Sequence, residues 1–390
     1  MLEIQKIIKD IDNLGREQAE FRNGLRDELS AADEVMRVIS SDLDTARARI
    51  DGAKTSWLTA GFDVSPETVY PLPDLPAAHA VVASDGSQIM PDKNEAALCF
   101  LLNTASITLY YGIPERPVAE TYPHLYYRED EIWESDYGGQ KVRMTEKMIS
   151  ARRAVSEMNT LERAVEIASK ANIPVVGLWD GSLIFWSIQS EPEAYRDRLL
   201  GEYFRAFDLA RSLGIPIAGY ISDPGGKDFV NSMRIMLCDQ VTVDCDKCLH
   251  RKDDSDFPCE QIAKLKDSSV FYKRLADGER SVMLSGSSRI LQQYGEHEIR
   301  MFYLNAGKEI VRIEVPKWVA EDTRMLNLVH AVCCDQSRKG RGYPVALSEA
   351  HEQAVIRSAE RAAFYDLVER AFIKYGARIS RSEKRIAKNY

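Results

Sequence analysis

Two copies of one tripeptide, Asp-Gly-Ser, follow apolar runs in this sequence. The first copy is Asp85–Ser87 in SDGSQI, and the second is Asp180–Ser182 in WDGSLI. Carboxylates bind hard divalent cations, and two such cations held about 3.5–4 Å apart can activate a water and stabilise the leaving oxygen of a phosphodiester. Asp85 and Asp180 are therefore candidate metal ligands. Each tripeptide also has a simpler interpretation, because Asp-Gly is a common turn dipeptide.

The two aspartates can act together only if their strands are neighbours. Hydrophobic periodicity predicts five strands and two helices, in the order strand 79–89, strand 96–112, strand 121–127, helix 140–170, strand 173–184, helix 191–214 and strand 215–223. This is the order of a ribonuclease H-like α/β fold, with a mixed sheet extended by parallel strands. The first and fourth strands of that fold lie side by side, roughly 4.8 Å apart. Asp85 and Asp180 would then point to one place.

A third carboxylate is expected from the helix between these strands. In ARRAVSEMNTLERAVEIASK, Glu157 follows Ala154 by three residues and precedes Leu161 by four, so it lies on the apolar stripe. Glu162 is about 140° further around the helix and falls on the solvated side with Glu166. We expect Glu157 to be the third ligand, with Glu162 as the alternative.

A fourth group is expected from a later helix. The segment 342–368 has a strong helical pattern, with His351 four residues after Leu347 and four before Val355. A histidine on such an apolar stripe is either an ordinary core residue or, beside three acids, a metal ligand or a group that transfers a proton.

A cysteine-containing segment, 238–260, forms a second candidate metal site. Its four thiols belong to Cys238, Cys245, Cys248 and Cys259, and the C-x-x-C pair has zinc-ligand spacing. A reduced loop without metal and a redox or cluster site are the alternatives. The odd total of seven cysteines fits a reducing compartment better than a disulfide scaffold.

Composition excludes several classes of protein. The net charge of −9 over 390 residues argues against a protein that coats nucleic acid by bulk electrostatics. The longest apolar run is interrupted by Asn103 and Thr104 and is shorter than the roughly 20 residues that a membrane-spanning helix needs. The N-terminus lacks the apolar core of a signal peptide. We therefore expect no membrane association and a cytoplasmic location.

The chain is expected to have three parts. Helical periodicity at the N-terminus ends at three prolines in YPLPDLP, and basic residues gather in the last segment, YGARISRSEKRIAKNY. The expected parts are a helical extension (1–75), a ribonuclease H-like domain with additional C-terminal strands and helices (76–375, including the cysteine loop), and a basic tail (376–390). Five cations after residue 279 are candidate phosphate contacts or members of a salt-bridged surface: Arg280, Arg289, Arg300, Arg312 and Lys317.

Five blocks of the sequence together resemble the NurA family of DNA-repair nucleases, over about residues 79–370. They are SDGSQI, LWDGSLI, LADGERSVMLSGSSRIL, MFYLNAGKEIVRIEVPKWVAED and KGRGYPVALSEAHEQAVIRSAERAAFY. The resemblance implies a manganese-dependent nuclease, with magnesium as an alternative cation, that digests DNA from 5′ ends and cuts single strands. It implies Asp85, Glu157, Asp180 and His351 as the metal site, and a nearby tyrosine for which Tyr220 is a candidate.

The same resemblance implies partners. Family members act as homodimers docked on a hexameric ATPase, HerA, which drives duplex DNA into the nuclease during end resection. The alternative is a catalytically inactive scaffold of the same fold that binds DNA or the ATPase. Three acids facing one site speak against the scaffold, because a scaffold has no use for uncompensated buried carboxylates.

Overall fold

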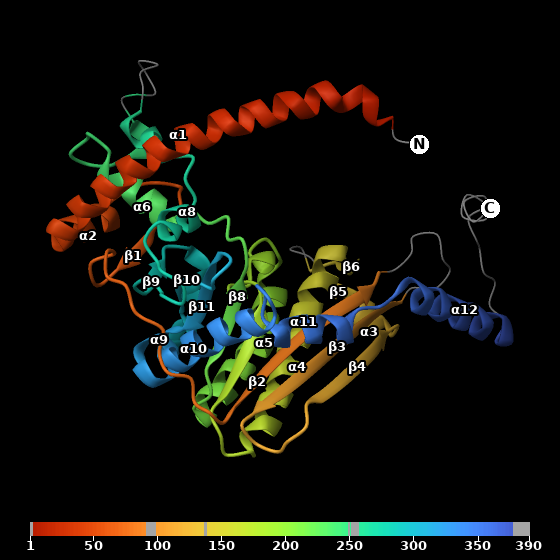
Figure 1. Ribbon diagram of the computed structural model, residues 1–390. Helices are drawn as coiled ribbons and strands as arrows, with labels where there is room; N and C mark the ends of the chain where they lie inside the picture. The colour runs from red at the N-terminus through yellow and green to blue at the C-terminus, as the bar shows by residue number, and fades with distance from the viewer. Residues whose placement is uncertain (1–2, 91–98, 136–138, 249, 251–256, 377–390) are drawn as a thin grey trace. The chain divides into compact units, whose positions relative to one another are not determined.

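The chain forms two compact units, each built from separate segments of the sequence. Residues 1–72 associate with 221–314, and residues 73–220 associate with 315–390. The computed structural model describes residues 3–90, 99–135, 139–248, 250 and 257–376 (Figure 1). The predicted domain 76–375 therefore takes in parts of both units, and residues 377–390 of the predicted basic tail lie outside the described residues.

The second unit contains a mixed sheet that carries both Asp-Gly-Ser tripeptides. Its five strands lie in the order β8 (Ile217–Ile221), β7 (Val175–Asp180), β2 (His79–Ile89), β3 (Phe100–Tyr111) and β4 (Val118–Tyr126). Strands β2, β3 and β4 are antiparallel, whereas β7 runs parallel to both β2 and β8. The predicted α/β class is confirmed, and the strands of the two tripeptides are neighbours.

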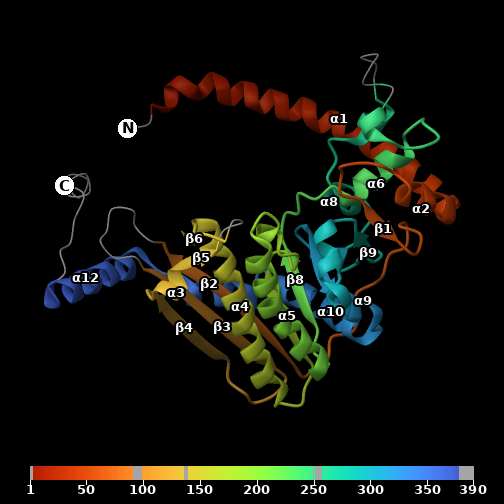
Figure 2. The same ribbon diagram turned by 180° about the vertical axis from the view of Figure 1, so that it is seen from behind.

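Helices cover both faces of this sheet. Helices α4 (Glu146–Ser169) and α5 (Glu193–Leu213) lie on one face, and α11 (Val345–Ala354) lies on the other (Figures 1 and 2). Strand β7 is buried on both faces as far as Trp179, which explains its continuous apolar sequence. The other elements of this unit are α3 (Glu129–Ile132), β5 (Trp133–Ser135), β6 (Lys141–Arg143), α9 (Lys317–Glu321), α10 (Thr323–Lys339) and α12 (Ser358–Lys374).

The helix predicted for 342–368 is two helices. Helix α11 ends at Ala354, Val355 is extended (φ −62°, ψ 131°), and α12 begins at Ser358. Arg357 and Glu360 form a capping box that starts α12. Hydrophobic periodicity continues through the break, so the sequence pattern alone did not reveal it.

The first unit combines the predicted N-terminal helices with four β-strands. Its strands lie in the order β1 (Ala60–Phe62), β9 (Leu284–Gly286), β10 (Ile299–Asn305) and β11 (Ile310–Pro316). Its helices are α1 (Ile8–Ser41), α2 (Leu43–Asp51), α6 (Asp228–Met236) and α8 (Asp267–Tyr272). Asp42 separates α1 from α2 and accepts a hydrogen bond from the Thr45 backbone N–H, which caps α2.

Two of the predicted phosphate contacts are instead buried in the first unit. Arg280 is 5% exposed and stacks on Tyr70 at 4.0 Å, and burial lowers the pKa of Arg280 to about 10. Arg312 is 8% exposed and pairs with Asp228 and Glu314 at 2.8 and 2.7 Å. For these two residues the phosphate prediction is wrong, because their charges serve internal contacts. No helix within the described ranges is long and apolar enough to cross a bilayer.

Candidate active site

Strand β2 presents the first tripeptide to two different helices. Side chains alternate across a strand, so Ser84 and Gly86 face α4 whereas Asp85 faces α11. The Ser84 hydroxyl donates to the Glu157 backbone carbonyl at 3.0 Å, and Asp85 Oδ2 lies 2.7 Å from His351 Nδ1. This tripeptide is strand and not a turn, because β2 continues to Ile89.

The second tripeptide begins where β7 ends. Asp180 is the last residue of the strand, and Gly181 leaves it with φ +103°, a conformation that favours glycine. Ser84 pairs with Trp179 in the parallel register, so Asp85 and Asp180 come one residue later on adjacent strands. The turn interpretation is therefore wrong for the first tripeptide, whereas at the second the chain bends away from the strand at Gly181.

Glu157 reaches the same region from α4 and is buried. Its carboxylate lies directly over Gly86, where an added Cβ would come within 2.5 Å of Glu157 Oε1. Arg153 Nε lies 3.0 Å from the same oxygen, but neither atom makes a hydrogen bond within the described residues. Burial raises the pKa of Glu157 to about 8, opposed by Arg153 and reinforced by the charges of Asp85 and Asp180.

His351 contacts Asp85, but it does not lie on a buried stripe. Its side chain is 60% exposed, while Leu347, Ala350 and Ala354 form the buried face of α11. The expected environment is therefore wrong, since Val355, the second residue used to define the stripe, lies beyond the end of the helix. The exposed imidazole instead lies on the α11 side of the sheet, against Asp85.

Tyr343 belongs to the site, although the sequence did not identify it. It makes a side-chain hydrogen bond with Asp180, which opposes the rise that burial causes in the pKa of Asp180. Asp85 also raises the pKa of Asp180, and His351 lowers it. The Asp180 side chain reaches solvent, yet the atoms packed around its carboxyl group still desolvate it enough to raise its pKa.

Tyr220, the candidate named from the sequence, lies in the core beside Tyr343. It is fully buried, and its hydroxyl lies 2.8 Å from Ser337 Oγ. Its ring packs edge-to-face on Tyr343, with the centroids 5.8 Å apart. The feature of the sequence that could have pointed to Tyr343 is the KGRG segment before it. Its Gly340 packs so closely on Tyr343 that an added Cβ would lie only 1.7 Å from the Tyr343 carbonyl oxygen.

The chemistry of a divalent-cation site is present in four side chains: those of Asp85, Glu157, Asp180 and His351. Three carboxylates and one imidazole are suitable ligands for manganese or magnesium, and Glu157 Oε1 is a buried acceptor without a hydrogen bond among the described residues. Among the residues that the structure describes, no three His, Cys, Asp or Glu side chains lie close enough together to hold a metal. The carboxylates repel one another electrostatically, so the side chains would have to turn inward around a cation.

The four cysteines of the loop are reduced, half-buried thiols in the first unit. Burial raises the pKa of Cys259, and the charges of Cys238 and Cys245 raise it further, so these three thiols are close enough to interact. Cys248 Sγ accepts from Gln240 Nε2 at 3.6 Å. Within the described residues these thiols do not form a ready metal cluster, and zinc binding stays a prediction.

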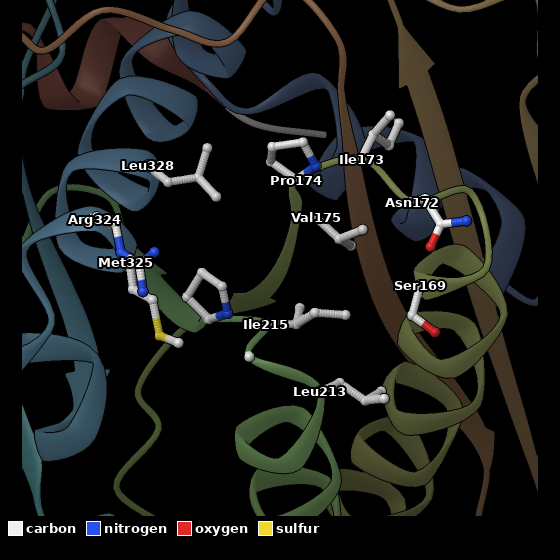
Figure 3. A pocket seen from close by; sticks show the side chains of 12 residues that line it. Ser169, Asn172, Ile173, Pro174, Val175, Leu213, Ile215, Arg324, Met325 and Leu328 are labelled. Carbon is white, nitrogen blue, oxygen red and sulfur yellow. The ribbon is translucent and has the colours of Figure 1, made fainter.

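A cavity of about 410 Å³ lies at the other end of the parallel strands (Figure 3). Its lining includes Val175, the first residue of β7, and Ile215 and Pro216, just before β8. Asp180 is at the opposite end of β7. The cavity is mainly apolar, with Arg324 and Met325 at its α10 side, and it contains none of the candidate metal ligands.

Comparison with known proteins identifies relatives of this arrangement. Residues 79–356 match the family model described as the NurA domain. None of the curated proteins matches the chain. The crystal structure of the NurA nuclease from Sulfolobus solfataricus aligns with 96% of this chain and 98% of its own, at 13% identity and a TM-score of 0.52. That similarity shows a shared fold. A crystal structure of NurA with manganese aligns with 91% of this chain and 98% of its own, at 9% identity and a TM-score of 0.41.

Proposed function

The chain belongs to the NurA family, and on that premise we propose that it is a metal-dependent nuclease that hydrolyses phosphodiester bonds in DNA. The observation that supports the proposal is that three carboxylates from separate elements lie near enough to shift one another's pKa. Asp85 comes from β2, Glu157 from α4 and Asp180 from β7, with His351 against the first and Tyr343 against the last. A scaffold without catalysis would gain nothing from burying Glu157 beside two further acids.

Manganese, or magnesium, would be held by Asp85, Glu157, Asp180 and His351. A cation of this kind polarises the phosphate and lowers the pKa of a bound water, and a pair of them would act on both sides of the scissile bond. Arg153 keeps a positive charge beside Glu157. Because His351 Nδ1 faces Asp85, its Nε2 is the nitrogen left to bind metal or exchange a proton. Tyr343 orients Asp180 through its hydroxyl group.

The DNA substrates and the partner that we propose are those that the family resemblance implies. We propose digestion of DNA from 5′ ends and cleavage of single strands, by a cytoplasmic homodimer working with a HerA-type hexameric ATPase in end resection of double-strand breaks. The alternative is a catalytically inactive protein that binds DNA or the ATPase.

End-labelled linear duplex separates the two functions. The wild-type protein should degrade it with manganese and not with a chelator, and Asp85→Ala and Asp180→Ala should each abolish degradation while the folded protein is retained. Glu166→Ala is the matched control, because Glu166 is an exposed acid on α4. Activity retained in either aspartate variant would contradict the assignment. Duplex binding without degradation by the wild-type protein would favour the scaffold.

We also propose a structural zinc ion in the cysteine loop, supported by the electrostatic proximity of Cys238, Cys245 and Cys259. Metal analysis of protein purified without chelator should give one zinc per chain. The variant Cys245→Ser should lose it, and Cys99→Ser, outside the loop, should keep it. A zinc-free wild-type protein would leave the loop as reduced cysteines.

A further inference from the structure

Two side chains of the sheet bind the same backbone carbonyl at the end of α11. Ser87 on β2 and Asn103 on β3 are directly opposite each other in the antiparallel register. The Ser87 hydroxyl and Asn103 Nδ2 both donate to the Ala354 carbonyl oxygen, the latter at 2.8 Å. Ala354 is the last residue of α11 and is fully buried.

These two hydrogen bonds satisfy a group that a helix end normally leaves without a partner. The last carbonyls of an α-helix have no intrahelical donor, and a carbonyl oxygen can accept two hydrogen bonds. Ser87 and Asn103 use both sites on one oxygen. The sheet therefore fixes where α11 stops, and the Val355 backbone turns away into an extended conformation.

The same attachment sets the position of His351. Asp85 precedes Ser87 by two residues, so both point from the same face of β2 toward α11. His351 precedes Ala354 by three residues, less than one helical turn. The strand thus contacts the helix at two adjacent points, through the side chain of His351 and through the carbonyl of Ala354. Two such contacts fix both the height of the helix along the strand and its rotation about its own axis.

The other end of α11 is tied down separately. Gln336 of α10 accepts from the Ala346 backbone N–H at 3.1 Å and donates to the Tyr111 hydroxyl at 3.0 Å. The helix is therefore held at both ends. Loss of the contacts at Ala354 would free the end that carries His351 without releasing the end next to Tyr343.

We propose that Ser87 and Asn103 are positioning residues that hold His351 against Asp85. The consequence for metal binding and catalysis rests on the proposed nuclease function, whereas the effect on the imidazole does not. Residues that orient a metal ligand typically contribute about 10- to 100-fold in metal affinity or activity. The third residue of the first Asp-Gly-Ser tripeptide thereby belongs to the site through the helix that it anchors.

The test uses full-length protein and two readouts. The first is the ¹⁵N spectrum of the His351 imidazole in metal-free, histidine-labelled protein, assigned by its loss in His351→Ala. The second is manganese affinity measured by electron paramagnetic resonance. The variants are Ser87→Ala, Asn103→Leu and the double variant, with Ser87→Thr to restore the hydroxyl. Tyr195→Phe is the control, because it removes a buried side-chain hydrogen bond to a helix carbonyl, that of Met148.

We expect the double variant to shift the His351 signals and to weaken manganese binding at least 10-fold, with Ser87→Thr and Tyr195→Phe close to wild type. When His351→Ala is already present, adding the double variant should cause no further loss of manganese affinity. Unchanged His351 signals in a folded double variant would overturn the proposal, as would an equal loss of affinity with and without His351. A wild-type protein that neither binds manganese nor cuts DNA would instead overturn the proposed function, and the imidazole spectrum would still decide the positioning role.

Discussion

At the scale of single residues, Glu157 is the group whose chemistry the fold changes most. Burial raises its pKa to about 8, so without a cation it keeps a proton at neutral pH. A metal ion must displace that proton to bind the carboxylate. Metal affinity should therefore rise with pH up to about 8.

This proton makes the stability of the metal-free protein depend on pH. The folded state retains it between the unfolded pKa, 4.5, and the folded pKa, about 8, while the unfolded chain has released it. The free energy of unfolding should therefore fall as pH rises through this window, by on the order of 5 kcal/mol from Glu157. Urea unfolding of the chelator-treated protein from pH 5 to 8 measures the slope.

Comparison of variants isolates Glu157 from other groups that titrate with the same sign. Burial also raises the pKa of Asp180, and it raises that of Asp267 to about 7 in the first unit. Glu157→Gln should make the pH dependence of the free energy of unfolding less steep, because the contribution of Glu157 is lost. Glu162→Gln, on the outer side of the same helix, should leave the slope unchanged. A wild-type slope in Glu157→Gln would show that this carboxylate is not protonated in the folded state.

Tyr343 and Tyr220 offer a matched pair of hydroxyl groups. The hydroxyl of Tyr343 hydrogen-bonds a candidate ligand, Asp180, whereas that of Tyr220 lies 2.8 Å from Ser337 Oγ. Tyr343→Phe should therefore lower nuclease activity and manganese affinity about 10- to 100-fold, as for other groups that orient a ligand. Tyr220→Phe should mainly lower the free energy of unfolding, by about 1 kcal/mol. Equal losses of activity in the two variants would contradict this assignment.

The sequence predicted the placement of the candidate acids better than that of the other candidate residues. Asp85, Asp180 and Glu157 follow from periodicity and strand order, which local patterns report. Tyr343 does not, because its contact with Asp180 joins residues far apart in the sequence through a turn whose geometry depends on Gly340. The environment of His351 was also missed, since it depends on where α11 ends.

At the scale of elements, the site depends on how closely β2 and α4 approach. Gly86 leaves room for the Glu157 side chain, and a Cβ there would come 2.5 Å from Oε1 and 2.7 Å from Cγ. Gly86→Ala should push the carboxylate away from Asp85 and Asp180. We expect loss of manganese binding and a cost in stability of about 1–3 kcal/mol from overpacking.

A glycine on α5 provides the control for this variant. A Cβ on Gly201 would meet nothing within 4 Å, so Gly201→Ala should leave manganese binding intact. It should also stabilise the protein by up to about 1 kcal/mol, because alanine favours a helix over glycine. Calorimetry and manganese titration of the two variants separate the approach of the elements from the general effect of an added methyl group. Wild-type metal affinity in Gly86→Ala would show that the contact is not required.

At the scale of the whole molecule, the sequence suggested an N-terminal extension, and the structure makes that segment part of a unit. Residues 1–72 share a core with 221–314, to which α1 contributes Ala32, Val35, Met36 and Ile39. The sequence predicted helical structure for this segment, but helical periodicity does not identify the partner of the helix. That partner is about 200 residues away in the sequence, and only the folded chain brings the two segments together.

This division predicts different outcomes for two truncations. The first residues of α1 expose their apolar side chains, with Ile8, Ile11 and Leu14 all more than half exposed, so deletion of residues 1–14 should leave both units folded. Deletion of residues 1–41 removes four core side chains, of which Val35, Met36 and Ile39 are worth about 1.5–3 kcal/mol each, a large part of the stability of an ordinary domain. Hydrogen exchange should then show residues 221–314 unprotected while β2 and β3 stay protected. Equal protection of both units after the longer deletion would mean that the first unit folds without α1.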